Sequence, residues 1–254
     1  MIPPCYVITL KDTLGKQGEV LKKAGLDPIA FKGVNAKNQE HVYYEDSFHS
    51  FLKKFMVDGA KGCSLSHKLL CKKLYDDDID MALVLEDDAY PIDGVDMNME
   101  IEKVLTEVPQ DWDVIRLHCN SFCKDGSNMT KGGDASSAAY LISRRGIVTF
   151  MNSNITIPVD NHLSINMKTY KSKHNLFWTD ENTSTIRGTD QTYIFEPLLN
   201  FLVPIKNGEK SWHVILNHSF LKIPYLNIEI STGDLILLIM CVVFLFLIVY
   251  LHFS

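Results

Sequence analysis

Three consecutive carboxylates, Glu86, Asp87 and Asp88, directly follow the apolar run Met81–Leu85. A short, unbroken apolar run is typical of a strand buried on both faces of a mostly parallel sheet. Carboxylates gathered at the end of such a strand repel one another and lose hydration, so we expect a cation beside them. Their hard oxygen atoms suit Mg²⁺ or Mn²⁺, and these ions in turn suit a diphosphate. The alternative is an acidic turn that only caps the next helix.

Two other segments carry polar side chains that could take part in chemistry. Between Gly59 and His67, glycines precede Ser64 and Ser66, and a helical apolar pattern follows. A helix N-terminus of this kind can hold a phosphate, although serines there are more often plain caps and an early histidine is more often structural. Asp160 ends the segment Ile-Pro-Val-Asp and is predicted at the start of a short helix, where the alternative role is an N-cap.

Strands and helices that alternate along the chain must position these residues. A strand over residues 5–10, a helix capped by Thr13 and closed at Gly25, and a strand over residues 29–34 predict a βαβ opening. Further strands are predicted over 81–85, 111–117 and 138–142, and further helices after Gly59, over 95–107 and after Ser143. Ligands of open α/β sheets bind at the carboxyl ends of the strands. The sequence therefore predicts an α/β fold with its site at the end of strand 81–85.

The composition indicates a globular protein. Of the 254 residues, 46% are hydrophobic and 22% are charged, which excludes a disordered chain. The net charge of -6 argues against nucleic acid as the partner. Six scattered cysteines do not form the pattern of a disulfide scaffold.

The C-terminal part contains an uncharged apolar run from Leu235 to Leu251. A helix of this length just crosses a hydrocarbon core about 30 Å thick, so we expect a single-pass C-terminal anchor, with a buried core helix as the alternative. The N-terminus shows no secretory signal. A domain made ahead of a C-terminal span folds in the cytosol, so we expect a membrane-bound protein with a cytosolic catalytic domain.

The order of the motifs resembles glycosyltransferase family 25, which includes lipopolysaccharide and procollagen galactosyltransferases. The motifs, in order, are YVITL, FKGVNAKN, KGCSLSH, ALVLEDDA, DWDVIRL, AAYLISRRG and IPVD, and they span Cys5–Leu163. The resemblance implies a GT-A-type, Rossmann-like nucleotide-sugar-binding domain, and we place it over residues 1–205. An irregular juxtamembrane segment over 206–234 and the anchor over 235–253 would follow.

The resemblance also implies the roles of the site residues. Asp88 would hold Mn²⁺ or Mg²⁺, with Glu86 or Asp87 at the metal, its bound water or the ribose. Ser66 and His67 would lie beside the UDP-sugar donor, and the residues expected near its nucleoside are Thr9, Asn35 and Ala36.

Family members are inverting enzymes, and an inverting transfer needs a base that takes the proton from the acceptor hydroxyl. Asp160, in the family-like IPVD element, is the first choice. Asp190 is the second, because it lies in a polar segment that could close over the acceptor; Asp113 and Glu181 are further reserves.

The expected reaction moves a hexose, galactose or glucose, to a hydroxyl of a glycan, lipid-linked or protein acceptor. Two alternatives remain open at this point. One is a divalent-ion-dependent nucleotidyltransferase or phosphatase that uses the same acidic strand end. The other is an inert, membrane-tethered interaction protein that keeps only the GT-A scaffold.

Overall fold

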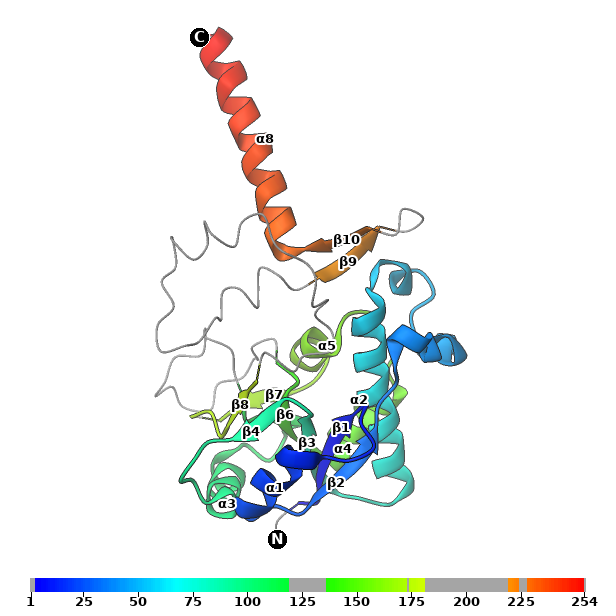
Figure 1. Ribbon diagram of the computed structural model, residues 1–254, viewed down its shortest axis with the longest axis vertical. Helices are drawn as coiled ribbons and strands as arrows, with labels where there is room; N and C mark the ends of the chain where they lie inside the picture. Colours follow the sequence, from blue (N-terminus) through cyan, green and yellow to red (C-terminus); the bar gives the residue numbers. More distant parts are fainter. Residues whose placement is uncertain (1–2, 119–135, 173, 181–218, 224–227, 254) are drawn as a thin grey trace. The chain divides into compact units, whose positions relative to one another are not determined.

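The fold is that of a computed structural model, which describes residues 3–118, 136–172, 174–180, 219–223 and 228–253 (Figure 1). The chain divides into two compact units. The first contains Met1–Lys53 and Asp58–Thr185, and the second contains Lys54–Val57 and Ile186–Ser254. The domain boundaries expected at residues 205 and 234 stay a prediction.

The first unit is built on a six-stranded sheet in the order β2-β1-β3-β6-β5-β7. Its strands are β1 (Cys5–Thr9), β2 (Pro28–Lys32), β3 (Met81–Glu86), β5 (Val114–Arg116), β6 (Ala139–Ser143) and β7 (Thr169–Lys171). The pairs β1–β2, β1–β3 and β5–β7 are parallel, whereas β6 runs antiparallel to both β3 and β5. The predicted α/β fold is confirmed, with β6 as the reversed strand that the apolar pattern did not reveal.

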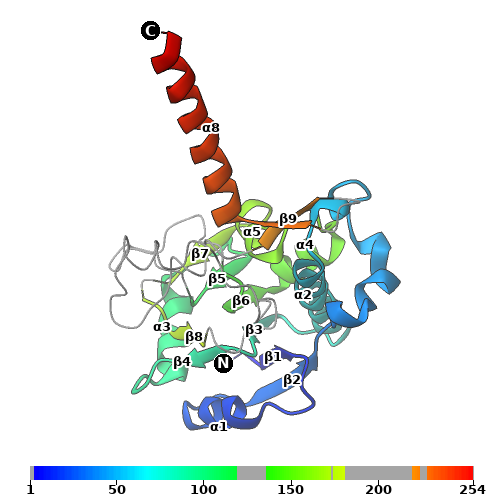
Figure 2. The same ribbon diagram turned by 45° about the horizontal axis from the view of Figure 1, so that its top comes forward.

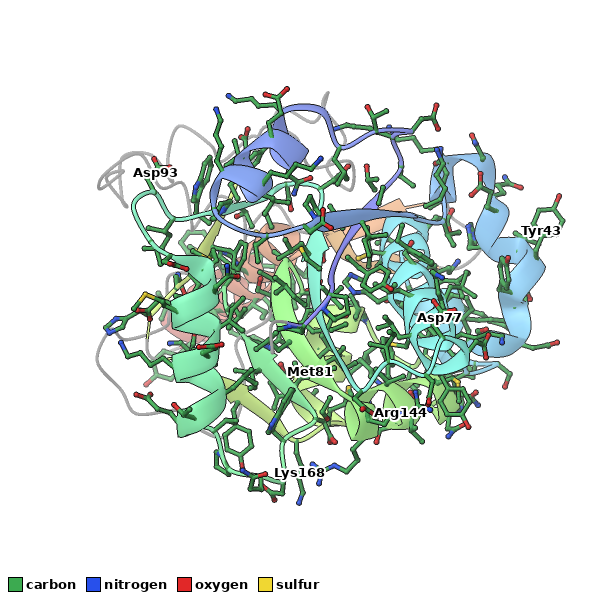
Figure 3. The ribbon with its side chains drawn as sticks, turned by 90° about the horizontal axis from the view of Figure 1, so that it is seen from below. Tyr43, Asp77, Met81, Asp93, Arg144 and Lys168 are labelled. Atoms are coloured by element: carbon green, nitrogen blue, oxygen red, sulfur yellow. The ribbon has the colours of Figure 1, made fainter. Side chains whose placement is uncertain are left out.

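Helices cover both faces of this sheet (Figures 1 and 3). On one face α1 (Gly15–Lys23) and α3 (Met97–Glu107) pack against side chains such as Leu83 and Leu85. On the other face α2 (Asp58–Asp76), α4 (Arg144–Asn152) and α5 (Val159–Ile165) pack against Ala82 and Val84. Successive residues of a strand point to opposite faces, so a strand covered on both sides is apolar throughout, as in Met81–Leu85.

The helix ends agree only in part with the predicted caps. Ser143 is the N-cap of α4, and its Oγ accepts a hydrogen bond from Gly146 N at 3.2 Å, as predicted. Thr13 is not the cap of α1, because Leu14 occupies that position and Gly15 has φ of +47°. A left-handed residue at that point is favourable only for glycine, so the turn rather than a side-chain cap starts the helix.

Shorter elements surround the sheet. Three 3₁₀ helices, η1 (Ala36–Asn38), η2 (Glu40–Ser47) and η3 (Leu52–Phe55), occupy the segment between β2 and α2. Directly after the acidic residues, β4 (Ala89–Pro91) pairs antiparallel with β8 (Phe177–Thr179). Neither strand of this small pair was predicted.

The second unit contains the antiparallel pair β9 (Ser219–Ile223) and β10 (Ile228–Ser231), followed by α8 (Thr232–Phe253). Among the helices that the structure describes, none is both long and apolar enough to cross a membrane. The expected transmembrane anchor over Leu235–Leu251 is therefore not supported.

Candidate functional site

The acidic segment forms a tight turn at the carboxyl end of the central strand β3. Glu86 is the last residue of this strand, and Asp87 and Asp88 make the turn into β4. The side-chain amide of the buried Gln17, on α1, donates hydrogen bonds to both ends of the turn, to Glu86 O at 2.8 Å and to Ala89 O at 2.7 Å. One amide group thus fixes the backbone from which the carboxylates project.

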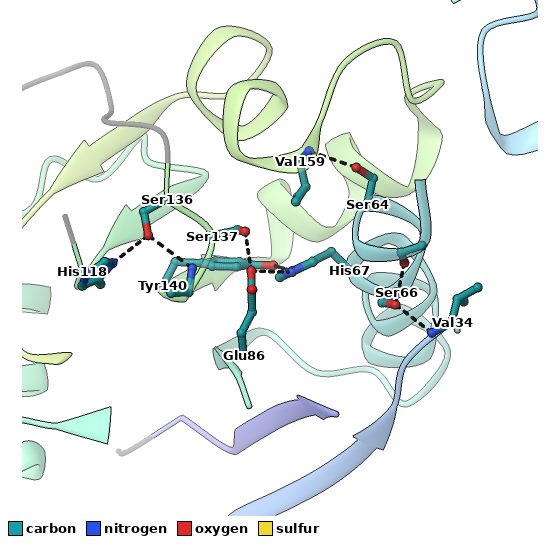
Figure 4. A network of polar contacts seen from close by, with 12 residues as sticks. Val34, Ser64, Ser66, His67, Glu86, His118, Ser136, Ser137, Tyr140 and Val159 are labelled. Carbon is teal, nitrogen blue, oxygen red and sulfur yellow. Dashed lines mark hydrogen bonds and ion pairs between the residues drawn. The ribbon is translucent and has the colours of Figure 1, made fainter. Parts of the chain in front are cut away.

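Glu86 faces α2 and belongs to a network of polar side chains (Figure 4). Its Oε1 accepts hydrogen bonds from His67 Nε2 at 3.2 Å and from the Ser137 hydroxyl. His67 is fully buried; its Nδ1 lies 2.8 Å from the Tyr140 hydroxyl, and the two rings stack with centroids 5.6 Å apart. A carboxylate can only accept, so Nε2 carries the proton of the bond to Glu86.

These partners decide the ionisation of Glu86. Burial by itself raises the pKa of this carboxyl group, but the hydrogen bond and charge of His67, the Ser137 hydroxyl and the charge of His118 lower it. The effects that lower the pKa are together larger than the effect of burial, so the pKa of Glu86 lies below its usual value. The group is therefore a carboxylate at neutral pH, held in place by hydrogen bonds to its charged form.

Asp87 contacts Thr9 of β1, and the family resemblance implied a role for both residues at the donor. The Thr9 hydroxyl donates a hydrogen bond to Asp87 Oδ2 at 3.1 Å, and Lys11 Nζ lies 3.8 Å from the same oxygen. Burial raises the pKa of Asp87 above its usual value, although Lys11 and Thr9 act in the opposite direction. A partly desolvated carboxylate of this kind gains from a further cation or hydrogen-bond donor.

The serines that were expected at a helix N-terminus lie inside α2 instead. This helix begins at Asp58, so Ser64 and Ser66 are in its second and third turns, and the predicted phosphate cradle is wrong. Ser66 Oγ donates to Gly62 O at 2.7 Å and accepts from Val34 N at 2.8 Å, and Ser64 Oγ accepts from Val159 N at 2.9 Å (Figure 4). Both hydroxyls thus join α2 to neighbouring backbone.

Gly62 allows α2 to pack closely against the segment that follows β2. A Cβ atom on Gly62 would lie 2.9 Å from Val34 O and 3.0 Å from Ala36 Cβ, so no side chain fits at this position. The contact places Ser66 beside the loop that carries Asn35 and Ala36. The Asn35 side chain accepts from Lys37 N at 3.0 Å and caps η1, while its backbone N donates to Glu40 Oε2 at 2.8 Å.

Asp160 lies in the first turn of α5, after the N-cap position that Pro158 occupies. The N-cap alternative for Asp160 is therefore wrong. Its backbone oxygen accepts a hydrogen bond of 2.6 Å from Nη2 of Arg116, which is fully buried on β5. Burial chiefly raises the pKa of the Cys63 thiol on α2, and the charges of Glu86, Asp160 and Asp88 raise it further. The fold thus brings Asp160 beside the carboxyl end of β5, where Arg116 is the last strand residue.

Two sets of atoms could hold a metal ion. The first, found within the described part of the chain, is Cys63, His67 and Glu86, whose ligand atoms lie within 4.8 Å of one another. Sulfur and imidazole ligands suit Zn²⁺ better than Mg²⁺ or Mn²⁺, and a metal there would break the His67–Glu86 bond. The second set is the oxygen atoms of the acidic turn. Glu86 is already held by His67 and Ser137, so Asp88 is the better candidate ligand.

The remaining predicted residues are not all near this site. Asp113 is wrong as a reserve base, because it precedes β5 at the amino end of the strands, the edge from which Figure 3 is viewed. Its carboxylate accepts from Arg145 Nε at 2.6 Å and Lys168 N at 2.8 Å. Asp190 and Glu181 lie outside the described residues.

Several residues of the site had no signal in the sequence. Gln17 is one polar residue among many on α1, and only its contact with the turn distinguishes it. Tyr140 and Arg116 lie on apolar strands and look like core or strand-end residues until β5 and β6 pair and bring them opposite each other. Arg116 is an exception in part, because a charged residue inside the predicted strand 111–117 indicates that it has a polar partner.

The fold and the site together define an α/β protein with an acidic centre at the carboxyl edge of its sheet. The sequence profile of glycosyltransferase family 25 (LPS biosynthesis protein) matches residues 2–163. The match covers more than half of the chain, so the chain belongs to glycosyltransferase family 25, and the resemblance seen in its motifs is confirmed. Membership of this family makes the protein a glycosyltransferase. No curated protein matches the chain.

Solved structures are similar only at low identity. A protein from STIV is 13% identical with a TM-score of 0.41, covering 71% of this chain and 86% of that chain. HddC from Yersinia pseudotuberculosis, complexed with GMP-PN, is 13% identical with a TM-score of 0.34, covering 70% and 93%. A mutant of Drosophila β-1,4-galactosyltransferase 7, complexed with manganese, UDP-Gal and xylobiose, is 8% identical with a TM-score of 0.38, covering 91% and 92%. TM-scores this low carry no argument about this chain.

Proposed function

We propose that this glycosyltransferase is a metal-dependent, inverting enzyme that moves a hexose from a UDP-sugar to a hydroxyl group. Galactose or glucose is the favoured sugar, and the acceptor is a glycan, a lipid-linked molecule or a protein. The observation that carries the proposal is the turn Glu86–Asp88, which places three carboxylates at the carboxyl end of the central strand in a family 25 chain.

The donor set of the turn fits Mn²⁺ or Mg²⁺. Carboxylate oxygens are the ligands that these ions prefer, and the Asp87 side chain is partly buried, with 19% of it exposed. Asp88 would be the principal ligand, with the carboxylates of its two neighbours adding negative charge. When bound, such an ion would offset the charge that develops on the leaving diphosphate.

The chain's own residues would perform the other tasks. Thr9 and Asp87 are joined at the ends of β1 and β3, which supports a nucleoside site there together with Asn35 and Ala36. Ser66 and His67 would act by holding the β2 loop and Glu86, since their polar atoms bond to the protein itself. The Asp160 carboxylate would take the proton from the attacking acceptor hydroxyl. Asp190 is the alternative base.

The test is the release of UDP. The purified chain is incubated with UDP-, GDP- and CMP-sugars, with Mn²⁺ or with EDTA, and with a panel of glycan acceptors. We expect UDP and a new glycoside only from a UDP-hexose, only with the metal, and at least about 10²-fold less in Asp88→Asn. The matched control is Asp93→Asn, because Asp93 is an exposed acidic residue of the segment after β4.

Other outcomes would overturn the proposal. Asp88→Asn with near-normal transfer in metal-replete buffer would remove the metal assignment. Release of inorganic phosphate or diphosphate instead of UDP would indicate a phosphatase or nucleotidyltransferase. A folded wild-type chain that binds no UDP would indicate an inert scaffold.

A further inference from the structure

An exposed pair of stacked aromatic rings lies on the small sheet formed by β4 and β8. Tyr90 and Trp178 are directly opposite each other in the register of the two strands. Their ring centroids are 5.1 Å apart with an angle of 25° between the planes. The Trp178 side chain nevertheless stays 47% exposed. A rigid aromatic face that is held in position by a neighbour and partly open to water can serve as a contact surface for a ligand.

This pair is fixed to the acidic turn by the backbone. Tyr90 follows Asp88 by two residues, and Asp180, two residues after Trp178, donates from its backbone N to Asp88 O at 2.8 Å. Burial raises the pKa of the Tyr90 hydroxyl, and the charges of Asp180, Asp87 and Asp88 raise it further. The backbone therefore holds the aromatic pair beside the acidic turn.

The rings lie on the side of the turn away from the proposed nucleoside site. Thr9, at the end of β1, contacts Asp87 from one side. The β4–β8 pair leaves the turn on the other side, and Figure 2 shows β3 between it and the strands β1 and β2, as does Figure 1. A donor that extends from β1 across Asp88 would present its sugar toward Tyr90 and Trp178.

We propose that Trp178, held by Tyr90, is the platform on which the acceptor's hexopyranose ring stacks during transfer. This inference rests on the proposed function, because it names the class of acceptor, a glycan with a terminal hexopyranose, for the same site. Trp178 would be a binding residue and Tyr90 a positioning residue.

The chemistry of the surface favours a sugar. One face of a pyranose ring is made of C–H groups and packs on an aromatic face, while its hydroxyls need acceptors at the rim. Trp178 supplies the flat face, and Asp180, two residues further along the chain, supplies a carboxylate acceptor near it. A uracil base also stacks on aromatic rings, but the proposed function assigns the nucleoside to Thr9 and Asp87.

Two measurements on the full-length chain test the proposal. In transfer assays we expect Trp178→Ala to raise the acceptor KM about tenfold, with kcat and the UDP-sugar KM nearly unchanged. Trp178→Phe should restore most of the affinity, because it keeps an aromatic face. Tyr43→Ala is the matched control: Tyr43 is 86% exposed on η2 and points outward in Figure 3.

The second measurement does not require turnover. Saturation-transfer NMR with methyl hexopyranosides and disaccharides, in the presence of UDP and the diamagnetic ion Mg²⁺, should show enhancement of the ring C–H protons in the wild type and in Tyr43→Ala. The signal should be lost in Trp178→Ala. If the wild type transfers no sugar, this signal still tests whether Trp178 binds a glycan, independently of the proposed reaction. Equal glycan signals in wild type and Trp178→Ala, no glycan signal in the wild type, or a loss confined to the uracil protons would overturn the proposal.

Discussion

His67 Nε2, on α2, lies 3.2 Å from Glu86 Oε1 at the end of β3, and the imidazole ring is fully buried. The bond joins the helix that packs on one face of the sheet to the strand that carries the acidic turn. Because His67 also bonds to Tyr140 on β6, a single side chain fixes α2 against two strands. His67 therefore acts on the site through Glu86.

We expect His67→Ala to lower the free energy of unfolding by about 2–4 kcal/mol, since it leaves Glu86 and Tyr140 with lost partners in a buried setting. The substitution also removes the hydrogen bond and the charge of His67, the largest effects that lower the pKa of Glu86. His67→Gln, which can still donate one hydrogen bond, should recover part of the stability. Thermal and urea unfolding at neutral pH measure both variants. Equal stability of His67→Ala and the wild type would show that the network contributes nothing.

Gln17 offers a test of the turn itself. Gln17→Glu keeps the volume of the side chain but replaces the donor amide by a carboxylate, which repels Glu86 O and Ala89 O. We expect a weaker response to Mn²⁺, measured as a higher metal concentration for half-maximal transfer. Lys16→Ala, at an exposed position of the same helix, is the control. If Gln17→Glu and Lys16→Ala need the same metal concentration for half-maximal transfer, the hydrogen bonds of Gln17 do not position the carboxylates.

Asp160→Asn tests the proposed base. The contact of Arg116 with Asp160 is made to the backbone oxygen, so the substitution leaves it in place. Transfer should fall about 10²-fold or more, the usual scale for loss of a general base, while UDP affinity stays unchanged. Calorimetric titration with UDP and Mn²⁺ checks the second part. A loss of UDP affinity would make Asp160 a donor ligand and move the search for the base to Asp190.

His162 should make the fold sensitive to acid. Burial, with a smaller effect from the charge of Lys68, lowers its pKa from 6.5 to about 4. The neutral ring accepts from Asn166 Nδ2 at 3.2 Å through Nδ1 and lies 3.0 Å from Ser153 Oγ through Nε2. Between about pH 6.5 and about pH 4, His162 is therefore protonated in the unfolded chain and neutral in the folded chain. The free energy of unfolding falls as the pH drops through this range and then levels off.

The expected loss from this one group is at most about 3 kcal/mol. Melting temperatures of the wild type and His162→Gln between pH 7 and pH 4 give the measurement. The carboxylates contribute to both curves, so the difference between the curves isolates His162. Parallel curves would show that the histidine does not titrate differently in the folded and unfolded chain.

Local pattern was enough to predict much of the scaffold. The apolar run Met81–Leu85 predicted a strand buried on both faces, because both of its faces are covered by helices. Ser143 was predicted as a helix cap, since capping depends on residues three positions apart. The ordered motifs predicted the family, and the acidic turn predicted the place of the site. In each case the information lies within a short segment or in the order of segments.

Contacts between distant segments decided the rest. The antiparallel direction of β6, the start of α2 at Asp58, and the meeting of Gln17 with Ala89 depend on packing that no short segment encodes. The same holds for Tyr90 and Trp178, which are adjacent only because β4 and β8 pair. The sequence by itself determined which residues could do chemistry and near which strand. Only the tertiary structure decided which side chain each carboxylate meets, because hydrogen bonds and ring contacts act over a few ångströms of space rather than along the chain.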